Sequence, residues 1–193
     1  MSATRLHSPL DTRTPTGGPV LVGLDPGAET GVAVWSPALG QLLHVGSGTF
    51  WAVRNLIEQR TDPARGTVRA GRWGVAGVVV EDPRALPIYA RHRSRAGGGP
   101  VGRGEADRIA RSVGRIDRDV DLWETWLRDA GFGVHLSAPQ RRRKWDAVEL
   151  ARMSGWTAPT NEHGRDAARL VVGRSASSAQ AWTSRGPEAG DAP

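Results

Sequence analysis

The sequence contains no cysteine, which excludes disulfide bonds and metal sites built on thiolates. It has no apolar run close to the roughly 20 residues that a membrane-spanning helix needs. Residues 1–18 also lack the apolar stretch of a secretory signal. We therefore expect a cytoplasmic protein with no membrane partner.

Lysine is almost absent, and arginine supplies nearly all of the positive charge. The chain has 26 lysines and arginines against 20 aspartates and glutamates, and Lys144 is the only lysine. The formal net charge is +6, and a basic balance of this kind suits a nucleic-acid partner. The many alanines, glycines and prolines beside the arginines are also typical of GC-rich coding, so charge alone does not identify the partner.

The length of 193 residues suits one domain with additional tails. Residues 1–18 and 175–193 are rich in small and polar residues and show no periodicity, so both are predicted to be disordered tails. The predicted domain spans residues 19–174. Hydrophobic residues make up 38% of the chain, which is enough for a core once the tails are set aside.

Apolar periodicity predicts an α/β domain with a mixed sheet. Three short strands joined by turns must form an antiparallel unit, and they are predicted at 20–25, 31–36 and 41–49. Gly27 and Gly31 are assigned to the first of these turns. A helix at 50–59 and a polar connection at 61–73 precede a strand at 74–80, whose valines are typical of a buried parallel strand. The remaining elements are a long helix, a strand and two helices, predicted at 105–130, 132–137, 139–153 and 161–173.

Three acidic residues lie at or near the ends of predicted elements. Asp25 ends the first strand, Glu81 ends the valine-rich strand, and Asp166 lies in the last helix. Asp25 alone could be an ordinary turn aspartate, and Asp82 could replace Glu81 if the strand end shifts by one residue. His163 precedes Asp166 by three residues and shares a helical face with it. If the two strands are neighbours, these acids converge and repel one another, so we expect a cation between them.

Clustered carboxylates suit Mg²⁺, which prefers oxygen ligands and keeps several waters. Two such ions would activate a water and stabilise the leaving oxygen of a phosphodiester. An imidazole beside the carboxylates favours tolerance of Mn²⁺. The residues predicted to hold the metal and carry the catalysis are Asp25, Glu81, His163 and Asp166. For His163 the sequence leaves two roles open, metal ligand or general acid and base.

Basic residues are concentrated in two segments beside these acids. The loop after Glu81 carries several arginines, and a run of four basic residues opens the helix predicted at 139–153. Cations are unfavourable at a helix N-terminus, so an external partner would explain that run. The alternatives are a mobile loop of biased composition and a solvated helix face. The predicted phosphate contacts are Arg84, Arg91, Arg93, Arg95, Arg141, Arg142, Arg143 and Lys144.

Three short motifs occur in a fixed order on these elements: GLDPG followed by TGVAVW, then VVVED, then HGRDAARL. In this order they resemble the RuvC-type Holliday-junction resolvases of the RNase H-like superfamily. The resemblance implies a mixed five-stranded sheet, with three antiparallel and two parallel strands, flanked by helices. It matches Asp25, Glu81 and Asp166 to the family's acids, and His163 to a position that carries Asp or His in the family.

The resemblance also implies an activity. This is divalent-metal-dependent cleavage of branched DNA such as four-way junctions, leaving a 5′-phosphate, usually by a homodimer that makes paired nicks. Two alternatives stay open, and the first of them keeps the superfamily that the resemblance implies. One is an RNase H-like nuclease acting on RNA–DNA hybrids or flaps, and the other is a DNA-binding module without catalysis.

Overall fold

A computed structural model describes residues 18–63, 72–86, 103–139 and 143–177. The predicted tails fall almost entirely outside these ranges. None of the described helices is long and apolar enough to cross a membrane. In chain order the elements are β1 (Val20–Asp25), β2 (Thr30–Ser36), β3 (Gln41–Gly48), α1 (Phe50–Arg60), β4 (Thr61–Pro63), β5 (Trp73–Glu81), the 3₁₀ turn η1 (Pro83–Ala85), α3 (Arg103–Asp129), β6 (Val134–Ser137), α4 (Ala147–Ser154) and α5 (Glu162–Val171).

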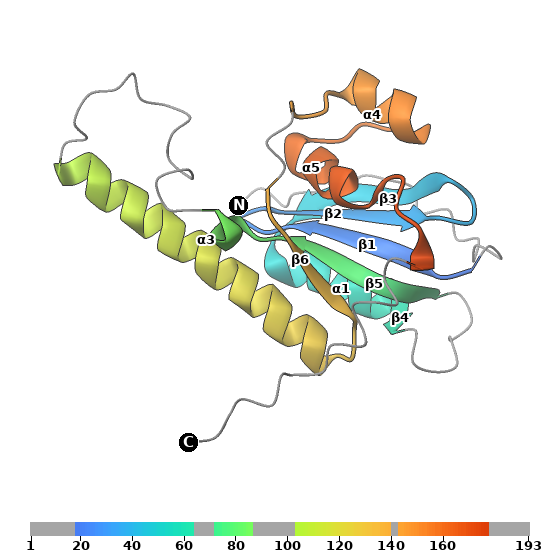
Figure 1. Cartoon of the computed structure of the whole chain (residues 1–193), viewed down its shortest axis with the longest axis horizontal. Coiled ribbons are helices and arrows are strands. Elements are labelled where there is room, and N and C mark those ends of the chain that lie inside the picture. Colours follow the sequence, from blue (N-terminus) through green and yellow to red (C-terminus); the bar gives the residue numbers. More distant parts are fainter. Residues whose placement is uncertain (1–17, 64–71, 87–102, 140–142, 178–193) are drawn as a thin grey trace.

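The strands form one mixed sheet with β1 at its centre (Figure 1). β1 pairs with β2 and β2 pairs with β3, both antiparallel. The other edge of β1 pairs in parallel with β5. The other edge of β5 is shared, since β4 pairs with its first residues and β6 with its last ones, both in parallel. The predicted mixed sheet of antiparallel and parallel strands, flanked by helices, is confirmed. The three-residue β4 is a further strand, which the polar connection at 61–73 did not indicate.

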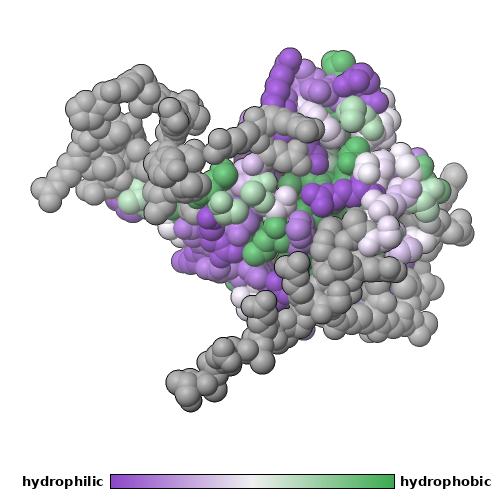
Figure 2. Space-filling model, viewed as in Figure 1, coloured by the Kyte–Doolittle hydropathy of each residue, from purple (hydrophilic) through white to green (hydrophobic). Residues whose placement is uncertain are grey.

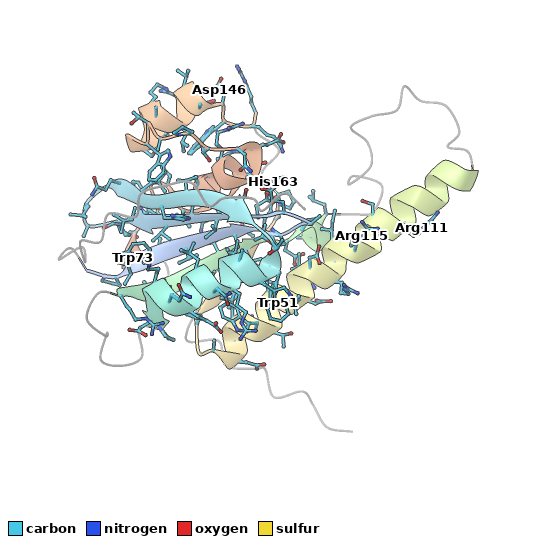
Figure 3. The ribbon with its side chains drawn as sticks, turned by 180° about the vertical axis from the view of Figure 1, so that it is seen from behind. Trp51, Trp73, Arg111, Arg115, Asp146 and His163 are labelled. Atoms are coloured by element: carbon cyan, nitrogen blue, oxygen red, sulfur yellow. The ribbon has the colours of Figure 1, made fainter. Side chains whose placement is uncertain are left out.

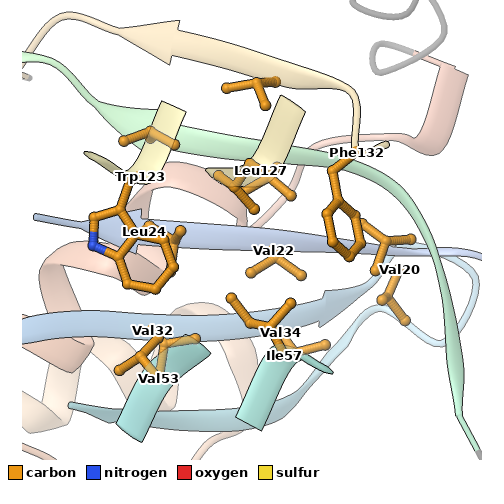
Figure 4. Packing of buried hydrophobic residues seen from close by; sticks show 14 of the residues in the cluster. Val20, Val22, Leu24, Val32, Val34, Val53, Ile57, Trp123, Leu127 and Phe132 are labelled. Carbon is orange, nitrogen blue, oxygen red and sulfur yellow. The ribbon is translucent and has the colours of Figure 1, made fainter. Parts of the chain in front are cut away.

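Side chains of β1 alternate between two cores, one on each face of the sheet. Val22 and Leu24 pack with α1 and α3 on one face, where Trp123 and Leu127 of α3 are almost completely buried (Figure 4). Leu21 packs with α4 and α5 on the other face. Trp123 and Leu127 lie four residues apart on one face of α3, and their burial fixes that face against the sheet.

The same alternation sets the face to which the acidic strand ends point. Asp25 comes two residues after Gly23, where a Cβ would meet the Ala167 carbonyl oxygen of α5 at 2.3 Å. Glu81 comes two residues after Val79, which packs in the same cluster as Ala167. Because residues two apart in a strand share a face, both acids lie on the side of the sheet that α5 covers.

Glycine lets α5 approach the sheet this closely. A Cβ at Gly31 would lie 2.0 Å from the carbonyl oxygen of His163, a contact as impossible as the one at Gly23. Gly31 pairs with Asp25 inside β2, which confirms it as part of the strand predicted at 31–36 and excludes a place in the turn. Gly27 does lie in the connection between β1 and β2. Gly31 therefore serves tertiary packing rather than chain reversal.

Two helix starts show how side-chain caps set boundaries. The helix predicted at 139–153 begins later, at α4, because Asp146 accepts a hydrogen bond from a first-turn amide and caps it. Arg143 and Lys144 therefore lie in a non-helical segment before α4, and their placement in a first helical turn was wrong. Asn161 caps α5 in the same way, which confirms the predicted start of the last helix.

Candidate functional site

The four residues predicted to form the site line one pocket of about 530 Å³. β1 and β5 are parallel neighbours in register, so the strand ends that carry Asp25 and Glu81 reach the same edge of the sheet. α5 crosses above this edge and contributes His163 and Asp166. The condition on which the sequence argument depended, that the two strands are adjacent, is therefore met.

The depth of these side chains differs. The side chain of His163 is 45% exposed and that of Asp25 is 16% exposed, and Nδ1 of the imidazole lies 3.4 Å from the carboxylate oxygen Oδ2. Asp25 also shares a hydrogen bond with the carboxyl group of Glu81. The carboxyl groups are thus at the bottom of the pocket, and the imidazole is at its mouth.

The crowding of acids changes their proton affinity. Burial raises the pKa of Glu81 to about 7, and the charges of Asp25 and Asp166 contribute further, while Arg169 opposes the effect. Burial also raises the pKa of Asp25, followed by the charge of Asp166, while His163 acts in the opposite direction. The pocket therefore resists the presence of several carboxylate charges at once unless a cation accompanies them.

Asp166 has a different environment, because two cations lie against it. Nζ of Lys144 lies 2.7 Å from its Oδ2, and Nη1 of Arg169 lies 3.6 Å from its Oδ1. The Asp166 side chain is only 10% exposed. Its Oδ1 atom is buried and accepts no hydrogen bond from the described part of the chain. One oxygen of this carboxylate is therefore satisfied by lysine, and the other lacks a hydrogen bond.

This donor set fits a hard divalent cation. Carboxylate oxygens are the ligands that Mg²⁺ prefers, and the buried Oδ1 of Asp166 has no hydrogen bond that a cation would have to displace, only the ion pair with Arg169. As arranged in the structure, no three histidine, aspartate or glutamate side chains within the described ranges are grouped closely enough to hold one ion. Because Lys144 and Arg169 already lie against Asp166, ligation by this residue requires it to exchange partners.

Further polar residues of the pocket were missed by sequence reasoning. Ser112, Arg115 and Asp119 of α3 line it, and Figure 3 shows Arg115 at the same end of the sheet as His163. Their position depends on where α3 crosses the sheet, which no local pattern reveals. Arg169 could have been found, because it follows Asp166 by three residues and so shares its helical face.

Arg84 and Asp82 form a separate network beside the pocket. The Arg84 guanidinium group pairs with Asp82, Asp121 and Glu124. Asp82 caps η1 through the Arg84 amide and does not line the pocket, whereas Glu81 does. At this strand end Glu81 is therefore the acid that lies in the pocket, and its role as a ligand stays a prediction. A phosphate role for Arg84 stays a prediction, and it would require this residue to leave three carboxylates.

Of the remaining predicted phosphate contacts, two lie in described segments. Arg143 is 86% exposed at its side chain and pairs with Asp146 at 3.7 Å, and Lys144 lines the pocket. The others lie outside the described residues, and they are Arg91, Arg93, Arg95, Arg141 and Arg142.

No protein-family model matches the sequence, and no curated protein matches it either. Among solved structures, two of Thermus thermophilus RuvC are similar to the chain. One is a complex with a Holliday junction substrate, with 14% identity over 84% of this chain and 94% of the other, at a TM-score of 0.45. The second has 16% identity over 84% of this chain and 97% of the other, at the same TM-score of 0.45. A TM-score below 0.5 does not establish a shared fold. The description of the fold is therefore based on the observed sheet, and the proposal of a function is based on the pocket.

Proposed function

We propose that this chain is a divalent-metal-dependent endonuclease that hydrolyses phosphodiesters in branched DNA. The observation that supports this best is the convergence of Asp25, Glu81 and Asp166 from two neighbouring strand ends and one helix. Burying carboxylates together is costly unless a cation neutralises them, and a pKa of about 7 for Glu81 is one measure of that cost. A DNA-binding module without catalysis would gain nothing from this arrangement.

In this proposal Asp25, Glu81 and Asp166 hold Mg²⁺, with Mn²⁺ as a tolerated substitute. Two bound ions would supply activation of the attacking water and stabilisation of the leaving oxygen. His163, at the mouth of the pocket, is placed to transfer a proton to or from a group that enters it, or to act as a further ligand. Attack of water on phosphorus breaks the bond to the 3′ oxygen, which takes up a proton, and a 5′-phosphate remains.

Cations at the rim of the pocket are suited to contact the DNA backbone. Arg115 on α3 and Lys144 before α4 both line the pocket, and Arg143 is the neighbour of Lys144. Arg115 is exposed, and within the described ranges no acidic side chain pairs with it. Figure 2 shows hydrophilic side chains gathered over α3 and over the segment that leads into α4. We assign these three residues to phosphate contacts that are independent of base sequence.

Substitution of the central acid tests the chemistry. Asp25→Asn should abolish Mg²⁺-dependent cleavage of a four-way junction while binding of the junction persists. Asp129→Asn is a matched control, because Asp129 is an exposed aspartate at the end of α3 that does not line the pocket. This control should cut like the wild type. Undiminished cutting by Asp25→Asn would refute the proposed function.

A substrate panel tests the specificity. We expect a four-way junction to be cut in preference to a flap and to an RNA–DNA hybrid of matched sequence. If the protein prefers the hybrid or the flap, the proposed metal-dependent hydrolysis stands and the proposed substrate is wrong. Paired nicks across a two-fold junction need two facing sites, so we also propose a homodimer. Light scattering that shows a strict monomer, even with junction DNA, would contradict this assembly.

A further inference from the structure

Two cations lie against Asp166 in the acid cluster, the buried guanidinium group of Arg169 and the exposed ammonium group of Lys144. The ammonium group lies 2.7 Å from Oδ2 of Asp166 and also contacts the carboxylate of Glu162. The two carboxylates are one turn apart on α5, and only Asp166 lines the pocket. The ammonium group therefore bridges one carboxylate inside the pocket and one outside it.

Of the groups in this contact, Lys144 is the one that can move. Its side chain is 60% exposed, whereas that of Asp166 is 10% exposed. The backbone beside it is held, because Nε of Arg165 donates a hydrogen bond to the Trp145 carbonyl oxygen at 2.9 Å and Trp145 packs against the core. The lysine side chain can therefore leave Asp166 without any movement of the segment, and Glu162, 59% exposed, remains as its partner.

The presence of lysine rather than arginine at this position supports the idea that another cation can displace Lys144 from Asp166. Lys144 is the only lysine, and the other 25 of the 26 lysine and arginine residues are arginines. A guanidinium group binds a carboxylate through a rigid two-pronged fork, whereas an ammonium group is a compact charge on a flexible stem. Lysine can therefore hold the carboxylate and still give way to another cation.

We propose that Lys144 is an internal counter-ion that competes with the divalent cation for Asp166. When the cation is bound, Nζ of Lys144 shifts to Glu162 at the rim, where it can meet a DNA phosphate. Lys144 is thus a positioning residue that couples metal loading to binding of the DNA backbone. This inference rests on the proposed metal-dependent function and adds a role for a residue that is not a metal ligand.

Two simpler explanations predict different results. If Lys144 only holds Asp166 in a ligating orientation, its removal should weaken metal binding. If its charge acts only through space, removal of a neighbouring charge should have the same effect. Arg143 separates these explanations, since it lies in the same segment and carries the same charge but does not line the pocket.

Metal affinity measured without DNA is the first test. Mn²⁺ binding to the full chain is followed by calorimetry or electron paramagnetic resonance. Lys144→Gln should bind Mn²⁺ about tenfold more tightly than the wild type, as expected on loss of a competing charge-assisted hydrogen bond, and Arg143→Gln should change affinity by less than about twofold. Lys144→Arg should bind more weakly than the wild type. Equal effects of the two glutamine variants, or weaker binding by Lys144→Gln, would overturn the inference.

The single lysine permits a second test that does not use variants. In protein labelled with ¹³C at lysine, one side-chain signal reports on Lys144. Saturation with Mg²⁺ should shift this signal and increase its mobility, and Asp25→Asn should abolish the response. If the wild type binds metal and the lysine signal does not change, this inference fails and the proposed function stands. If neither the wild type nor Lys144→Gln binds a divalent cation, both fail, whereas binding by Lys144→Gln alone supports the competition.

Discussion

Replacement of Glu81 by glutamine should stabilise the metal-free protein at alkaline pH. Glu81 ends β5 and shares a hydrogen bond with Asp25. Burial, followed by the charges of Asp25 and Asp166, raises the pKa of Glu81 from 4.5 to about 7. A glutamine has the shape of the protonated acid and can donate the same hydrogen bond, but it never acquires the charge.

The sign and size of the effect follow from proton linkage. Because the folded protein holds the Glu81 proton more tightly than the unfolded chain, the stabilisation is complete below pH 4.5 and is lost as the pH rises through about 7. The gap between these two pKa values corresponds to about 3 kcal/mol of unfolding free energy well above neutral pH. For a domain of this size, that amounts to roughly 6–12 °C in Tm.

Calorimetric or denaturant unfolding in the presence of EDTA measures this difference. Wild type and Glu81→Gln should be equally stable at about pH 4, below both pKa values, and the variant should be more stable at about pH 8.5. Glu162→Gln is the control, because hydrogen bonding to Lys144 lowers the pKa of Glu162 and its replacement should give no such gain. Excess Mg²⁺ should stabilise the wild type and not Glu81→Gln. A wild type that remains as stable as Glu81→Gln at alkaline pH in EDTA would refute the reasoning.

Three further predictions concern packing, acid stability and DNA contact. Gly31→Ala should cost about 1–3 kcal/mol in denaturant unfolding, because its Cβ would lie 2.0 Å from the His163 carbonyl oxygen, whereas Gly27→Ala, with its nearest atom at 3.4 Å, should be neutral. Burial lowers the pKa of His44 from 6.5 to about 4, so stability should fall as the pH drops through this window, and His44→Leu should not show this loss. Arg115→Ala should weaken DNA binding regardless of sequence and reduce the slope of log affinity against log salt by about one, and an unchanged slope would exclude a phosphate contact.

Local patterns were sufficient for much of the fold and for the identity of the acids. The valine run of β5 and the acid that follows it are visible in the sequence, as are the turn after Asp25 and the cap at Asn161. Each of these depends on neighbours within a few residues, which is the range over which periodicity and capping act. The start of α4 was predicted too early. The capping side chain of Asp146 begins the helix after the basic run, and helical spacing alone does not reveal where a helix begins.

The sequence by itself determined which residues end strands, which helical face carries His163 and Asp166, and where positive charge is concentrated. Only the tertiary structure decided that β1 and β5 are neighbours, that α3 contributes to the pocket, and that Lys144 lies against Asp166. The physical reason is that strand order and helix placement result from burying apolar faces far apart in the chain. Gly31 illustrates the difference: the sequence places it where a turn meets a strand, and the fold uses the missing side chain to bring α5 onto the sheet.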